Sequence, residues 1–141
     1  MTAKQYLRQA YRLNELINSD IQELEQLKAL SRSISSPNLS GMPSGSRKQE
    51  APFVNPILKI IDLENYINAE IDRFVDLKKE IRTVIYQIPD NNQKLCLKLR
   101  YIQFLKWEAV AVDMNLSLKQ VHRIHCEALQ EVQKILPYDT Q

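Results

Sequence analysis

The sequence predicts an all-α protein, in which a long antiparallel, coiled-coil-like helical hairpin precedes a small C-terminal helix-turn-helix domain. Three observations support this fold class. Two long segments each carry one apolar stripe at helical spacing. The 141 residues include only two glycines, few for a sheet with many tight turns. The last third holds three shorter helical patterns, with a short turn between the last two. We therefore expect a hairpin at residues 1–88 and a second domain at residues 89–137.

The first long helix should run from Thr2 to about Ser33. Its apolar residues recur every three or four positions, which is close to a heptad repeat. They are Tyr6, Ala10, Leu13, Ile17, Ile21, Leu24 and Leu27. The following residues, at about 34–55, are rich in Ser, Pro and Gly and predict a flexible linker.

The second long helix should begin with Asn55 as its N-cap and Pro56 in its first position, and Pro89 should end it. One narrow seam between two such helices leaves parts of both stripes uncovered, so we expect a homo-oligomer, most simply a dimer. The alternative is that the stripes pack only on each other and on the C-terminal domain. The second stripe comprises Ile57, Ile60, Ile67, Ile71, Phe74, Ile81, Ile85 and Ile88.

The C-terminal region predicts three helices. The first is capped by Asp90 and has Leu95, Leu99 and Ile102 on one face. The second is "WEAVAVDM", and the third begins after the turn "NLS" and closes before Pro137. This is the layout of a helix-turn-helix unit.

The turn carries strong local signals. Asn115 is the best non-glycine residue for the left-handed position that ends a helix. Ser117 and Gln120 form an S-x-x-Q capping box at the start of the next helix. Leu116 can pack between the two helices, and the small Ala111 lets them cross closely.

The third helix has two different faces. Val121, Ile124, Ala128 and Leu129 follow helical spacing and should be buried. The opposite face presents Lys119, Gln120, His122 and Arg123 in the first turns, where a recognition helix meets base edges in the major groove. Arg and Lys suit guanine, and Gln suits adenine. The alternative is a solvated polar face.

Residues 99–129, with their "LRY", "WEAVA", "NLS" and "V-x-R-I-H-x-x-A-L" pieces, resemble the fourth conserved region of bacterial sigma factors. They resemble more closely the phage-encoded ArpU-type late-gene transcription regulators. "SGMPSGS" and "KIIDLENYINAEIDRFVDLKKEI" are also similar to an uncharacterised phage family. The resemblance implies a transcription regulator in the cytoplasm of a bacterial host. It places Arg100 near the DNA backbone and assigns five base-reading positions: Leu118, Lys119, Gln120, His122 and Arg123.

The chain departs from the pattern at three positions. Leu118 is apolar where relatives carry a polar residue, so it could contact a thymine methyl group or pack internally. Phe104 and Lys106 stand where the pattern has Gly and a Ser or Thr cap. The other sigma regions are lacking, so an accessory regulator is favoured over a complete sigma factor. Residues 88–141 carry seven Lys or Arg against six Asp or Glu, so one domain alone should bind DNA weakly.

The sequence favours double-stranded DNA as the partner and predicts no enzyme and no cofactor. It lacks a nucleophile elbow, a phosphate loop and an H-E-x-x-H motif. No apolar run approaches the roughly 20 residues that span a bilayer, so we expect no membrane partner. The alternative function is an interaction or assembly module that docks on RNA polymerase or another phage protein.

The stretch "VHRIHCEAL" places His122, His125 and Cys126 on one side of a helix, as in a zinc site. A fourth ligand is lacking nearby, because Cys96 lies thirty residues away. We therefore expect no metal and no reactive thiol here. Instead, Cys126 should be a small buried residue, His122 should face the DNA, and His125 should lie toward the rim. Trp107 either faces the DNA or packs on the domain.

Overall fold

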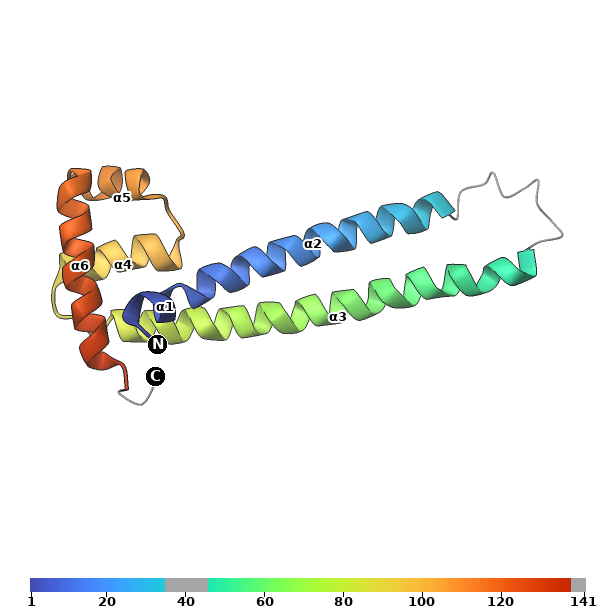
Figure 1. Cartoon of the computed structure of the whole chain (residues 1–141), viewed down its shortest axis with the longest axis horizontal. Helices are drawn as coiled ribbons and strands as arrows, with labels where there is room; N and C mark the ends of the chain where they lie inside the picture. The colour runs from blue at the N-terminus through green and yellow to red at the C-terminus, as the bar shows by residue number, and fades with distance from the viewer. Residues whose placement is uncertain (35–45, 138–141) are drawn as a thin grey trace. The chain divides into compact units, whose positions relative to one another are not determined.

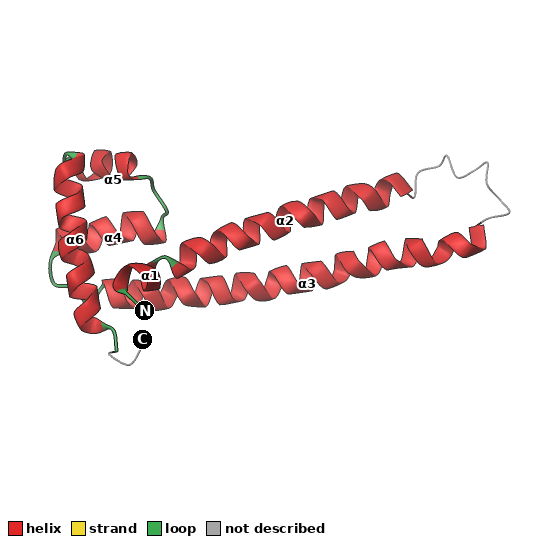
Figure 2. Ribbon diagram, viewed as in Figure 1, coloured by secondary structure: helices red, strands yellow, loops and turns green. Residues whose placement is uncertain are grey.

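The computed structural model describes residues 1–34 and 46–137, with side chains described for 1–33 and 56–137. The described residues form helices and no strand, which confirms the all-α class (Figure 2). The helices are α1 (Ala3–Leu7), α2 (Gln9–Ile34), α3 (Ser46–Ile85), α4 (Asn91–Leu97), the π-helix η2 (Lys98–Ile102), α5 (Trp107–Met114) and α6 (Leu118–Ile135). None of these helices combines the length and apolar character that a membrane crossing requires.

The first helical segment is divided in two, where the sequence predicted one helix. Thr2 caps α1 in a capping box with Gln5, and the chain turns at Arg8 before α2 begins. The backbone N–H of Ala3 donates to Oε1 of Gln133 on α6 at 2.8 Å. The break therefore lets α1 pack on α6 while α2 continues along α3.

The start of α3 differs from the prediction. The helix begins at Ser46, so Asn55 is not its N-cap and Pro56 lies within it. Residues 47–51 are all strong helix formers, which accounts for the earlier start of α3. The prediction of a linker at residues 34–55 did not take their helix propensity into account. The part of that linker at residues 35–45 lies outside the described residues. At its other end α3 stops at Ile85, three residues before the expected end, although Ile88 remains buried.

The chain divides into two compact units, described separately below. The terminal unit contains residues 1–14 and 73–141, and the hairpin unit contains residues 15–72. The ends of both long helices therefore pack with the C-terminal helices. The expected functional division into residues 1–88 and 89–137 stays a prediction.

The hairpin unit consists of the antiparallel α2 and α3 (Figure 1). Ile17, Leu24 and Ile67 fill its seam, and Lys28 pairs with Glu64 at 3.3 Å. Several stripe residues are nevertheless exposed, including Ile21, Ile57 and Ile71, which the sequence placed in the seam. The exposed apolar side chains of this unit are Leu16, Ile21, Leu30, Ile57, Leu58, Ile61, Tyr66 and Ile71.

The terminal unit has two neighbouring apolar clusters. The larger one joins α1, the ends of the long helices, α4 and α6 around Leu7, Ile81, Leu97 and Val132. The smaller one lies within the helix-turn-helix and contains Cys96, Leu99, Val110, Ala111 and Val121. The second cluster holds α6 against α5 and so fixes which face of α6 is exposed.

The helix after Asp90 is irregular. Asp90 caps α4 as expected, accepting from the Gln93 N–H at 3.0 Å. At residue 98 the helix widens into η2, in which the Gln103 N–H donates to the Lys98 carbonyl, a five-residue step. The wider turn rotates the buried face. Leu95, which precedes the wider turn, is exposed, contrary to the prediction, whereas Leu97 and Tyr101 are buried.

Candidate nucleic-acid interface

The turn between α5 and α6 has the predicted geometry. Asn115 ends α5 in the left-handed conformation (φ 57°, ψ 42°). Its N–H donates to the Val112 carbonyl, and the next N–H, from Leu116, donates to the Ala111 carbonyl, both at 3.1 Å. These two bonds satisfy carbonyls that the end of the helix would otherwise leave open.

The capping box at the start of α6 is also confirmed. The Gln120 N–H donates to Oγ of Ser117 at 3.2 Å, and the Ser117 N–H donates to Oε1 of Gln120 at 3.0 Å. The cap therefore occupies the carbonyl end of the Gln120 side chain. The side-chain NH2 group of Gln120 therefore remains available to donate to an acceptor on a base edge.

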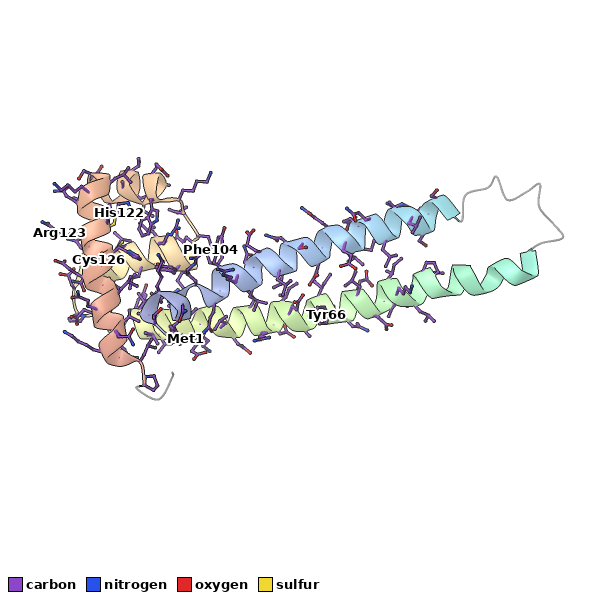
Figure 3. The ribbon with its side chains drawn as sticks, viewed as in Figure 1. Met1, Tyr66, Phe104, His122, Arg123 and Cys126 are labelled. Carbon is purple, nitrogen blue, oxygen red and sulfur yellow. The ribbon has the colours of Figure 1, made fainter. Side chains whose placement is uncertain are left out.

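The face of α6 turned away from the core carries the predicted polar residues. Val121, His125, Ala128 and Val132 are buried at helical spacing. Lys119, Gln120, His122 and Arg123 are exposed, and Figure 3 shows Arg123 projecting outward. Leu118 begins the helix and is 42% exposed, so it does not pack into the core. The five predicted base-reading side chains thus share the accessible start of one helix.

His125 and Cys126 exchange the places that the sequence assigned to them. Cys126 is exposed on the outer face of α6, whereas the sequence predicted a small buried thiol. His125 is only 7% exposed, whereas the sequence placed it toward the rim. Side-chain polarity misled the prediction, because partners from other elements accommodate the imidazole in the interior.

The environment of His125 keeps its imidazole neutral. A hydrogen bond of 2.7 Å joins its Nε2 atom to the Tyr101 hydroxyl, and the Trp107 ring meets it edge to face at 4.6 Å. Burial, and then the charges of Lys4, His122 and Arg100, lower the pKa of His125 to about 4. The same burial raises the pKa of Tyr101 to about 12. His125 is therefore a structural residue with a fixed charge state at neutral pH.

Trp107 connects Arg100, the predicted backbone contact, with His122 on α6, the predicted recognition helix. The Arg100 guanidinium lies over its ring, with Cζ 4.5 Å from the centroid, and His122 lies beside it at 4.9 Å. Arg100 also donates from Nη1 to the Leu105 carbonyl at 2.9 Å. Trp107 is half-buried and packs on the domain, the second of the two alternatives. The result is a continuous contact from Arg100 to His122.

The backbone before α5 is irregular at Phe104, the position where the sigma-like pattern has Gly. Phe104 has φ 61°, the left-handed region that favours glycine, and Lys106 precedes α5 without a side-chain cap. Ring packing compensates for this backbone conformation. The Phe104 ring lies 5.6 Å from Tyr11 and 6.2 Å from Phe74, and Nζ of Lys78 lies 5.3 Å from its centroid.

The described residues contain no group of three His, Cys, Asp or Glu side chains that could hold a metal ion. His125 is buried whereas Cys126 is exposed, so the spacing in "VHRIHCEAL" does not bring the two side chains together as a ligand set. Comparison with protein-family models, curated proteins and solved structures gives no match to this chain.

Sequence reasoning missed two basic residues of the terminal unit. Lys4 and Arg8 lie on and just after α1 and line one pocket together with Arg100. Their i, i+4 spacing places both on one helical face. That spacing was a usable signal, but only the fold brings them to Arg100, 92 positions after Arg8.

Proposed function

We propose that this chain is a sequence-specific DNA-binding transcription regulator that reads the major groove with the start of α6. The observation that carries the proposal is the pairing of the Asn115–Ser117 turn with an accessible face bearing Lys119, His122 and Arg123. In a helix-turn-helix the N-terminal part of the second helix contacts base edges, while the first helix crosses the backbone.

The local charge supports this assignment despite the small net charge. The first two turns of α6 contain Lys119, His122 and Arg123 and no carboxylate, since the first acidic residue of the helix is Glu127. Arg100, stacked on Trp107, adds a cation next to His122. A phosphate strand at the start of α6 would meet only cations and neutral groups, whereas the exposed carboxylates Glu108 and Asp113 of α5 must face away from it.

The experiment that tests the proposal is a mobility-shift selection with fragments of the genome that surrounds the gene. At about 150 mM salt, at least one fragment should bind better than random DNA, because nonspecific binding weakens strongly with salt. If every fragment binds as random DNA does, the chain is not a sequence-specific regulator.

The base-reading role of Arg123 can be tested on the selected fragment. Arg123→Ala should weaken specific binding by roughly 1–3 kcal/mol and relax the base preference at one position. Lys134→Ala is the matched control, because Lys134 lies on the same helix in its last turn and pairs with Glu131 at 2.9 Å. If both variants bind like the wild type with intact folding, Arg123 is not on the reading face.

A second candidate function is a module that docks on RNA polymerase or another protein. Two apolar side chains of the helix-turn-helix favour it: Val112 is 73% exposed on α5, and Leu118 is exposed at the start of α6. Val112→Ser, which adds no charge to the helix expected to cross the DNA backbone, should weaken docking and leave DNA affinity unchanged. Pull-down of purified RNA polymerase by the wild type and the variant distinguishes the two functions, since equal capture would exclude Val112 from such a surface.

A further inference from the structure

The terminal unit contains a pocket of about 150 Å³ between α1 and the π-helix η2, apart from the exposed outer face of α6. Its walls combine three cations with four aromatic rings. Among the described residues, no carboxylate lines it. The lining residues are Lys4, Arg8, Tyr11, Arg100, Tyr101, Phe104 and Trp107.

The cations of the pocket converge from two elements. Lys4 and Arg8 come from one face of the N-terminal segment, and Arg100 comes from η2. Arg100 is held in place by its bond to the Leu105 carbonyl and by stacking on Trp107. Because a guanidinium has five N–H donors, one bond to a carbonyl leaves most of its donors for a ligand. Three like charges around one cavity repel each other, and an anion would relieve that repulsion.

The positive charge of this pocket also affects the pKa of the neighbouring His125. Lys4 and Arg100 are among the groups that lower its pKa, after burial.

We propose that this pocket binds a phosphate group, carried either by a free phosphate compound or by a DNA strand. A phosphate offers several acceptor oxygens and up to two negative charges, which match three cationic donors arranged around it. The aromatic walls of Tyr11, Phe104 and Trp107 suit the organic part of a phosphate ester, which packs or stacks against rings. None of the predicted base readers lines the pocket, and Arg100 is the one lining residue that was predicted to lie near the DNA backbone.

The first arm of the test uses inorganic phosphate and a mononucleotide with the full chain. Trp107 is the only tryptophan and lines the pocket, so its fluorescence reports occupancy directly. Ionic strength is kept constant with sodium chloride. A free ligand should give a saturable change, and Lys4→Gln and Arg8→Gln should each weaken it about tenfold. Arg12→Gln is the matched control, because Arg12 lies one turn after Arg8 and does not line the pocket.

The second arm measures the salt dependence of duplex binding with the same variants. If the pocket holds a backbone phosphate, Arg8→Gln should reduce the slope of log affinity against log salt by about 0.9, and Arg12→Gln should not. A fluorescence response with an unchanged slope assigns the pocket to a free phosphate compound. A changed slope without a saturable response assigns it to DNA.

The proposal is overturned if phosphate and the mononucleotide give no saturable response and the DNA slope is the same in all variants. Thermal unfolding of each variant checks that its fold is intact. The first arm needs no DNA, so failure of the DNA-binding function would leave the test of a free phosphate ligand valid.

Discussion

Lowering the pH from 7 to 5 will destabilise the terminal unit through His125. The imidazole is buried against Tyr101 and Trp107, and burial with nearby positive charge holds its pKa at about 4, compared with 6.5 for a free histidine. In the unfolded chain the same group takes up a proton near pH 6.5. Between these two values the unfolded state binds more protons than the folded state, so acid favours unfolding.

The size of the effect follows from the two pKa values. The neutral imidazole contributes its full stabilisation above about pH 6.5. This stabilisation is lost progressively as the pH falls from 6.5 to about 4. The loss reaches about 2 kcal/mol at pH 5 and about 3 kcal/mol below pH 4. A domain of this size has a total stability of roughly 5–15 kcal/mol, so the change is large enough to measure.

The assay is urea unfolding at pH 7, 6, 5.5 and 5, followed by the fluorescence of Trp107. These conditions avoid the range in which Asp and Glu take up most of their protons. His125→Gln removes the titrating group. The slope of the unfolding free energy against pH should therefore decrease by the equivalent of about one bound proton. His122→Gln is the comparison variant: His122 is exposed, and its charge is only one of the causes that lower the pKa of His125 after burial, so this variant should keep the decline. Equal slopes for the wild type and His125→Gln would refute the reasoning, whatever the absolute stability of the variant.

Four further predictions concern the fold. Phe104→Ala should destabilise the protein by about 2 kcal/mol through lost ring packing. Phe104→Gly should destabilise it by about 1 kcal/mol less, because glycine adopts the φ of 61° at this position without strain. Urea unfolding in which the Gly variant is less stable than the Ala variant would contradict this. Ser117→Ala should cost about 1 kcal/mol by removing the cap of α6, which thermal unfolding measures. Cys126 is exposed and should react with a thiol reagent in the folded protein. Cys96 should react only on unfolding, because it is buried and burial raises its pKa to about 11. Rapid reaction of both thiols in the folded protein would disprove the difference. The exposed apolar side chains of the hairpin unit should join copies of the chain, so light scattering at micromolar concentration should give more than the monomer mass.

The features predicted best from the sequence were those determined by a few neighbouring residues. The left-handed Asn115, the capping box of Ser117 and the cap at Asp90 depend on local hydrogen bonds that any helix end requires. The limits of α5 followed from the same signals. The exposed position of Arg123 followed from helical spacing once the start of α6 was known.

The features that were missed depend on distant partners or on small changes in helical geometry. His125 is buried because Tyr101 offers it a hydrogen bond, and nothing near His125 in the sequence indicates this. The π-helix at Lys98–Ile102 shifts the residues after it relative to a 3.6-residue period. Leu95, which precedes it, is exposed although its apolar side chain predicted a place on the buried face. The pocket at Lys4 combines residues 4–11 with residues 100–107, which a search for local motifs cannot bring together.

The bond between Ala3 and Gln133 also constrains the order of folding. Residues 3–10 contribute Ala3, Leu7 and Ala10 to the same core as Ala128 and Val132. During synthesis the first segment can therefore complete its packing only after α6 has been made, although Ile81 and Ile85 of the same core emerge earlier. Closing so large a loop is entropically slow. The long helices can form by local contacts in the meantime, which makes closure of the terminal unit a late step in the life of the nascent chain.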